Sequence, residues 1–367
     1  MKKYLLFPIF LLGLFFLMPQ ARSQDPNYSQ YFSEPLYFNP AMTGINTGLR
    51  ARFSFRDQWP NLPVDFKSYY FSADIGDRNL PGAGGFGIVI NSDNLGVSLI
   101  KNLMVGLNVA VRIPINANLV AQVGLKASVV QRRLNWDDFV FSDQLSEKYG
   151  NIYLSQFTAP DVNSKVFPDF AAGGVLQFAS EEGNVSGTVG FSVDHLFKPD
   201  ESFLSTSTAP LPRKFMGNLD LVLTTAGRVS SGIYSSTNEP LRINPGIMYQ
   251  NQGNQSLIQA GLNLLKYNIY LGGWFKGSFD ANTGSAIALL AGYRYTFAEN
   301  MSIKFMYSYD LQMSGNLQGM GGAHEISLIL EFDKLSLFGG TVGGGGSFTT
   351  PGHSSRNNAP LECPSFY

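Results

Sequence analysis

The three histidines and the single cysteine are the residues best suited to metal binding or nucleophilic catalysis. His195 falls in a predicted loop, His324 beside a strand start, and His353 and Cys363 in the tail. The sequence contains no HExxH, CxxC or GxSxG spacing, the patterns that place zinc ligands or a nucleophilic serine. It therefore predicts no metal, no cofactor and no catalytic residue, and Cys363 is expected to be a free thiol.

His324, Glu325 and Ser327 suggest another chemistry, the Ser–His pair of a hydrolase. Such a pair requires a base that points at the nucleophile. Neighbouring residues of a strand point to opposite faces, so His324 and Glu325 do not share a site. The glycine run at 339–347 lacks the Lys-Ser/Thr ending of a phosphate-binding loop. We expect that the protein is not an enzyme.

Charged residues recur on one face of several predicted strands. The basic ones are Arg50, Arg52, Arg56, Arg112, Lys126, Arg294 and Lys304, and the acidic ones are Asp74, Asp310, Glu325 and Glu331. In a closed barrel this face is the lumen, so the charges either line a pore or neutralise one another inside a plugged barrel. Because isolated buried charges are costly, we favour neutralisation.

Alternation of apolar and polar residues identifies the elements that carry these charges. From Met301 to Leu311 the odd positions are apolar or aromatic, whereas the even positions include Lys304 and Asp310. Several such segments reach the roughly 9–11 residues that a tilted strand needs to cross a bilayer. They predict an all-β fold, a transmembrane antiparallel β-barrel of about 14 strands (roughly 12–16). The expected strands are 49–57, 66–76, 83–92, 99–113, 117–133, 167–180, 184–194, 215–229, 242–251, 255–266, 268–279, 284–297, 301–312 and 322–332.

The connections predict the orientation of the barrel. Bacterial barrels have short periplasmic turns and longer external loops, and the two longest connections, 134–166 and 195–214, both follow odd-numbered strands. Both termini are then periplasmic. The aromatic external loop 134–166 favours either contact with a secreted client or surface protein, or a lid packed on itself. Its candidate interaction residues are Trp136, Phe139, Tyr149 and Tyr153.

Residues 24–48 form an aromatic, proline-rich segment ahead of the barrel. Prolines at 26, 35 and 40 preclude a regular strand or helix, and a disordered leader would carry fewer aromatic residues. We expect this segment at the periplasmic end, packed on the barrel interior, on its rim or on a partner. Its candidate interaction residues are Tyr31, Phe32, Tyr37 and Phe38.

The chain ends add two further regions to the barrel at 49–332. Lys2 and Lys3, the apolar run 4–18 and the small residues Ala21 and Ser23 predict a signal peptide over 1–23. The apolar run is short for a membrane anchor, which needs about 20 residues. Residues 333–367 form a Gly-rich periplasmic tail.

The composition fits a barrel in the outer membrane. Only 14% of residues are charged, against about 25% in a typical soluble domain. The formal net charge of −1 gives no sign of a nucleic-acid partner. Composition alone also fits a soluble, Phe-rich β-sandwich.

Motifs along the whole mature chain resemble those of the PorP/SprF family. QDPNYSQY at 24–31 and EPLYFNPAMTG at 34–44 are similar to the family's mature start, with Glu34 where the family has Asn. Further matches are RDQWP at 56–60, DHL at 194–196, PRKF at 212–215, YSYD at 307–310, GAHEI at 322–326 and the terminal CP at 363–364.

The resemblance implies an outer-membrane component of the type IX secretion and gliding machinery of Bacteroidetes. It would support export or surface attachment of clients that carry a C-terminal secretion signal. The partners implied are the lipid bilayer, periplasmic ring and motor components, a peptidoglycan-binding lipoprotein, and a secreted adhesin or other client. The resemblance implies no active-site residues. The alternatives are a porin-like or hydrophobic-nutrient transport barrel and a barrel enzyme.

Overall fold

The computed structural model of the protein describes residues 25–335, except 65, 78–82, 97–99, 159–161, 182–183, 204–206, 226–239, 279–284, 299, 314–318 and 334. The predicted signal peptide and nearly all of the predicted tail, with His353 and Cys363, lie outside the described residues. No helix within the described ranges is long and apolar enough to cross a membrane.

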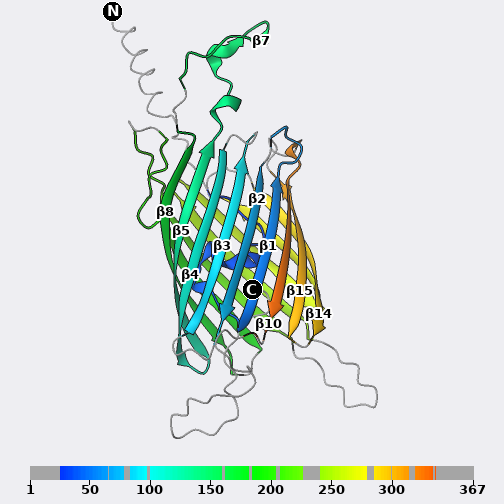
Figure 1. Ribbon diagram of the computed structural model, residues 1–367. Helices are drawn as coiled ribbons and strands as arrows, with labels where there is room; N and C mark the ends of the chain where they lie inside the picture. The colour runs from blue at the N-terminus through cyan, green and yellow to red at the C-terminus, as the bar shows by residue number, and fades with distance from the viewer. Residues whose placement is uncertain are drawn as a thin grey trace, which may run out of the picture.

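Fourteen of the described strands form one closed antiparallel barrel (Figure 1). The predicted all-β barrel and its strand number are therefore confirmed. Each strand pairs with its neighbours in the chain, and β1 closes the ring by pairing with β16, from Leu49↔Phe332 to Gln58↔Ala323. The barrel strands are β1 (Gly48–Gln58), β2 (Lys67–Gly76), β3 (Ala83–Leu95), β4 (Ile100–Asn116), β5 (Leu119–Leu134), β8 (Ser164–Ala179), β9 (Val185–Asp194), β10 (Lys214–Thr224), β11 (Arg242–Gln252), β12 (Gln255–Lys266), β13 (Ile269–Gly277), β14 (Ala286–Ala298), β15 (Met301–Gln312) and β16 (Ala323–Phe332).

The alternation along each strand separates a lipid-facing exterior from a polar lumen. On β4 and β5 the outward residues between the two ends of the strands are aliphatic, and Leu107 and Leu125 are 63% and 62% exposed. The inward residues of the same strands, such as Asn108 and Lys126, are buried. Closure leaves no unpaired strand edge in the membrane, where an unpaired backbone group would cost several kcal/mol.

The two ends of the barrel differ in their connections. At the lower end in Figure 1, β4 turns directly into β5 and β12 turns into β13 through Tyr267 and Asn268. These two residues have positive φ angles of 50° and 68°, as a tight hairpin turn requires. The upper end carries the long connection that contains β6 (Leu145–Ser146) and β7 (Gly150–Asn151). By the loop-length rule, the upper end is the one predicted to be external.

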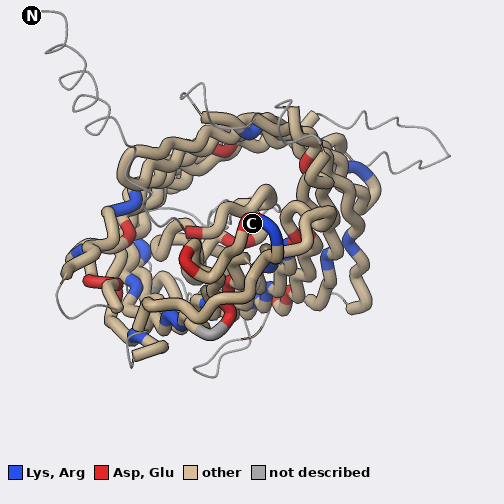
Figure 2. The backbone as a smooth tube through the Cα atoms, turned by 90° about the horizontal axis from the view of Figure 1, so that it is seen from above, with Lys and Arg blue, Asp and Glu red and all other residues tan. Residues whose placement is uncertain are grey.

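Residues 25–47 lie inside the ring of strands, as the view along the barrel shows (Figure 2), and are called here the luminal segment. It contains three short helical turns: η1 (Tyr31–Ser33), α2 (Pro35–Phe38) and η2 (Pro40–Met42). The prediction that its prolines preclude a helix is therefore wrong in part. Pro35 and Pro40 each stand in the first turn, where the missing N–H is not needed.

The luminal segment runs through the barrel rather than lying at one end. Asp25 contacts His195 and Lys214, at the upper ends of β9 and β10, whereas Gly48 begins β1 at the lower end. The predicted position of the segment at the periplasmic end is therefore wrong. A pattern of aromatics and prolines does not encode which strands the segment meets, and the long-range contacts set its course. The termini themselves lie outside the described residues, so their predicted periplasmic position stays a prediction.

Candidate functional site in the barrel lumen

The upper end of the luminal segment is held by a cluster of charged groups. The Oδ2 atom of Asp25 lies 3.0 Å from Nε2 of His195 and 2.8 Å from Nζ of Lys214. The other ring nitrogen of His195, Nδ1, lies 2.9 Å from Oδ2 of Asp169. His195 thus bridges one carboxylate of the segment and one of the barrel wall. These four residues are called here the upper latch.

The protonation of the upper latch follows from its geometry. Burial lowers the pKa of His195, but the neighbouring Asp25 and Asp169 outweigh it and raise that pKa to about 10. Burial raises the pKa of Asp25, but Lys214 and His195 together hold it well below its usual value. At neutral pH the imidazolium and the carboxylate are therefore both charged, and the contact is an ion pair.

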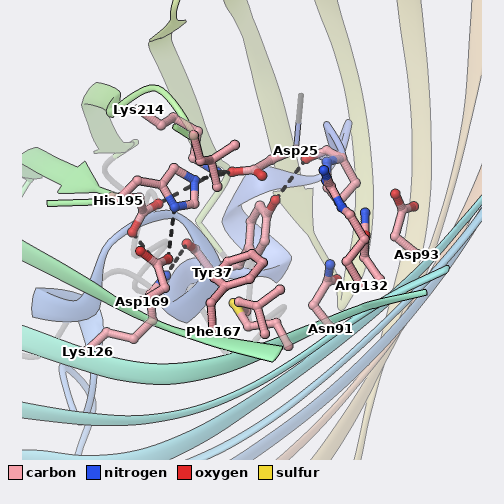
Figure 3. Close-up of a pocket in the computed structure, with 16 residues that line it drawn as sticks. Asp25, Tyr37, Asn91, Asp93, Lys126, Arg132, Phe167, Asp169, His195 and Lys214 are labelled. Atoms are coloured by element: carbon pink, nitrogen blue, oxygen red, sulfur yellow. Dashed lines mark hydrogen bonds and ion pairs between the residues drawn. The ribbon is translucent and has the colours of Figure 1, made fainter. Parts of the chain in front are cut away.

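Tyr37 lies next to the upper latch, and two lysine side chains approach its ring (Figure 3). Nζ of Lys214 is 4.5 Å from the centre of its ring and Nζ of Lys126 is 5.9 Å from it. Such cation–π contacts stabilise by about 0.5–2 kcal/mol. The Tyr37 hydroxyl donates to the carbonyl oxygen of Pro26 at 3.2 Å. A cavity of about 50 Å³ remains among these groups, enough for ordered water.

A second polar cluster binds the segment at Ser29 and is called here the serine latch. Oγ of Ser29 accepts from Arg56 Nη1 and Lys276 Nζ, both at 2.7 Å, and donates to Asp310. The backbone N–H groups of residues 29 and 30 each donate to Glu325 at 2.8 Å. Arg56 also pairs with both Asp310 and Glu325 at 2.9 Å. The latch therefore links the segment to β1, β13, β15 and β16.

Aromatic rings fill the space between the two latches and the lower half of the lumen. Tyr31 packs edge-on against Trp274 of β13, with ring centres 5.3 Å apart, and its hydroxyl donates to Asp220. Phe32 lies 5.9 Å from the same indole. Phe38 packs against Tyr37 at 5.2 Å. Full burial of each such side chain contributes about 1.5–3 kcal/mol. The predicted interaction residues Tyr31, Phe32, Tyr37 and Phe38 are thus all buried in the barrel interior, the first of the three locations considered.

Two glycines let the segment approach the wall closely. A Cβ atom on Gly124 of β5 would lie 2.4 Å from the backbone nitrogen of Ala41. Gly44 has a positive φ of 62°, and a Cβ there would lie 2.5 Å from the Cα of Gly85. Only glycine fits both positions without moving backbone.

The charged residues predicted to face the lumen are paired with one another. Glu331 lies within 4 Å of Arg50, Arg294 and Lys304, Lys126 pairs with Asp194 at 3.0 Å, and Arg52 pairs with Asp74. Arg112 instead donates to Gln177 at 2.9 Å. Mutual neutralisation, the favoured interpretation, is confirmed for the ion-paired residues.

The four predicted loop residues divide into two groups. Trp136 and Phe139 belong to an aromatic cluster in which the Trp136 ring lies 5.7 Å from Phe139, 5.9 Å from Phe157 and 6.3 Å from Phe203. Tyr149 and Tyr153 are instead 66% and 55% exposed, and so available to a partner. The loop therefore combines a self-packed base with an exposed tip.

His324 and Ser327, the residues of the possible hydrolase pair, do not meet. His324 meets the hydroxyl of Tyr307 through Nδ1 at 2.8 Å, whereas Ser327 faces the lumen and lies 2.9 Å from Oγ of Ser54. Among the residues that the structure describes, no group of three or more His, Cys, Asp and Glu could hold a metal ion.

The sequence did not predict the upper latch as a site, although three of its four residues lie in motifs that resemble those of the family. Asp25 belongs to QDP, His195 to DHL and Lys214 to PRKF. The serine latch likewise joins SQY, RDQWP, YSYD and HEI through Ser29, Arg56, Asp310 and Glu325. The fourth residue of the upper latch, Asp169, lies outside these motifs. Motifs that lie far apart in the chain thus meet in the lumen, where each wall motif contacts the luminal segment.

Residues 20–330 match the family described as type IX secretion system membrane protein PorP/SprF. This match covers most of the chain. The protein belongs to the PorP/SprF family. It is therefore a membrane component of the type IX secretion system, and its barrel lies in the outer membrane.

Solved outer-membrane proteins are similar to this PorP/SprF chain at low identity. Omp33 from Acinetobacter baumannii is 8% identical, with a TM-score of 0.37 over 79% of this chain and 99% of that one. A FadL homologue from Pseudomonas aeruginosa is 11% identical, with a TM-score of 0.40 over 78% of this chain and 89% of that one. A deletion mutant of TodX, a monoaromatic hydrocarbon channel, is 10% identical, with a TM-score of 0.41 over 81% and 93% of the two chains. No curated protein matches the chain.

Proposed function

We propose that this PorP/SprF protein supports the export or surface attachment of client proteins that carry a C-terminal secretion signal. The observation that carries the proposal is the occupied lumen. Its own segment, residues 25–47, is buried there and tied to the wall by the upper latch and the serine latch. Such a barrel serves as a platform that holds other proteins, rather than as the channel through which client proteins pass.

The two ends of the barrel suggest different partners. The loop tip at the upper end exposes Tyr149, Tyr153 and Leu154, the last at 94%. Exposed aromatic and aliphatic side chains are what a protein interface buries, so this end suits a secreted adhesin or other client. On the lower side, the partners proposed are periplasmic ring and motor components and a peptidoglycan-binding lipoprotein. We propose no catalytic role.

Deletion of the gene in the parent bacterium tests the proposal against a transport function. The expected result is that a reporter fused to a C-terminal secretion signal no longer reaches the cell surface, while uptake of small nutrients is unchanged. Purified protein in a planar bilayer should show no steady conductance. Slower nutrient uptake with normal reporter display would instead establish a porin-like or hydrophobic-nutrient transport barrel.

A further inference from the structure

Two cations stand side by side on the outer surface of the barrel, at its upper rim. Lys101 of β4 and Arg133 of β5 are register partners and both are exposed. They continue the outward-facing column of β4 that runs from Leu103 to Ile115. The side chains therefore point away from the lumen, toward the lipid phase.

The length of that apolar column places the cations at a membrane surface. Twelve residue steps from Leu103 to Ile115 span about 40 Å along the strand. At a tilt of about 40° this corresponds to about 30 Å along the membrane normal, the thickness of the hydrocarbon core. Lys101, the next outward residue of β4, thus stands at the level of the lipid headgroups.

The surroundings of Lys101 and Arg133 leave their charges uncompensated by an ion pair. No carboxylate within the described ranges forms an ion pair with either side chain. Nε and Nη2 of Arg133 each donate to the amide oxygen of Gln131 at 3.1 Å, which leaves Nη1 for a ligand. The two cations line a hollow of about 270 Å³, together with Leu134, Asn135, Asn163 and one carboxylate, Asp138. Asp138 accepts instead from Asn135.

We propose that this hollow binds a phosphate on the headgroup of an outer-leaflet glycolipid. An ammonium and a guanidinium match the charge of a phosphate group, and arginine matches its geometry as well. The neighbouring amides of Asn135 and Asn163 suit the sugar hydroxyls that carry such a phosphate. The volume exceeds that of a single ion, and the apolar column below it would lie along the acyl chains. The site thus selects a phosphorylated sugar lipid rather than a soluble anion.

The test uses the full mature chain in nanodiscs and three probes: lipid A carrying both phosphates, phosphatidylglycerol, and inorganic phosphate. Binding is measured by native mass spectrometry and by competition with a fluorescent lipid A. The variant is Lys101→Gln with Arg133→Gln. The matched control, Lys148→Gln with Lys266→Gln, removes two other exposed cations, one in the upper loop and one at the lower end.

The expected result is a loss of lipid A affinity on the order of tenfold in the first variant and none in the control. Both variants should keep the heat-modifiable mobility of a folded barrel. Equal binding by the two variants would overturn the proposal. So would a phosphatidylglycerol affinity that falls by the same factor as that of lipid A, or displacement of lipid A by millimolar inorganic phosphate.

Discussion

Nε2 of His195 lies 3.0 Å from Oδ2 of Asp25, although 170 residues separate the two in the chain. The contact joins Asp25, at the start of the luminal segment, to the upper end of β9. It holds the upper end of the luminal segment, whose other end continues into β1 at the lower end of the barrel. Because both groups titrate, the contact also makes the docking of the segment sensitive to pH.

Docking of the luminal segment should weaken at alkaline pH. The pKa of His195 rises from an ordinary value of 6.5 to about 10 in the folded protein. Its stabilising contribution is therefore complete below about pH 6.5 and declines until pH 10. The Asp25 pKa is lowered, so its contribution is lost only as pH falls below the usual aspartate range. The urea midpoint of Trp274 fluorescence should fall between pH 6.5 and 10.

A Trp59→Phe, Trp136→Phe background isolates the signal of Trp274, which packs on Tyr31. In that background, His195→Gln should remove most of the fall in the urea midpoint of Trp274 fluorescence between pH 6.5 and 10. A midpoint that falls equally in the variant would show that another group controls the transition.

Gly124→Ala should displace the luminal segment while leaving the barrel closed. The new methyl group would lie 2.4 Å from the backbone of Ala41, and such overpacking typically costs about 1–3 kcal/mol. Gly273→Ala is the matched control, since a Cβ there meets nothing within 4 Å. Trp274 fluorescence should shift to a lower urea midpoint in the first variant alone. Equal midpoints would mean that the segment does not depend on this close approach.

Removal of the segment's aromatic side chains should abolish secretion without unfolding the barrel. The change is Tyr31, Phe32, Tyr37 and Phe38 to Ser, and each loss removes about 1.5–3 kcal/mol of apolar burial. The strands keep their own hydrogen bonds, so heat-modifiable mobility should persist. Display of the C-terminal-signal reporter should fall to the level of the deletion strain. Normal secretion by this variant would reduce the segment to a spacer.

The exposed tip of the β6–β7 loop should be needed for client display. Tyr149→Ser, Tyr153→Ser and Leu154→Ser remove exposed side chains and leave the Trp136 cluster intact. Surface immunofluorescence of the client should drop severalfold. Phe197→Ser alters another exposed upper-end residue, 76% accessible, and should have no effect. Unchanged display in the triple variant would favour a lid that serves only the barrel.

Labelling in intact cells should show that the upper loop and Asp333 lie at opposite ends of the barrel. Asp333 contacts Arg50 and the backbone of Asn300 at the lower end. In a Cys363→Ser background, cysteine at 148, in the upper loop, should react with an impermeant maleimide. Cysteine at 333 should react only after the outer membrane is permeabilised. The reverse result would mean that the barrel has the opposite orientation in the membrane. The proposed client and periplasmic faces would then be exchanged.

The strands were predictable because each one shows the alternation of apolar and polar residues within its own sequence. β15 alternates over its whole length, and the observed bounds Met301–Gln312 coincide with the predicted ones. The luminal segment carries no such local signal: its three helical turns depend on burial against the wall. The latches were hidden for the same reason, since Asp25 meets His195 and Ser29 meets Glu325 only after the barrel has closed. His195 therefore read as a loop residue, although the motifs that carried the family resemblance already contained it.

The course of the luminal segment also limits the direction in which the segment could leave the barrel. The segment is continuous with β1 at Gly48, and β1 is sealed to β16 by pairing from Leu49↔Phe332 to Gln58↔Ala323. The β1–β16 pairing prevents the segment from leaving sideways between strands. The covalent link to β1 at the lower end prevents it from leaving through the upper end. It can withdraw only lengthwise, downward past its own anchor, and the two latches at the upper end must break first. A pull on the segment from the lower side would therefore act on the upper latch and the serine latch first.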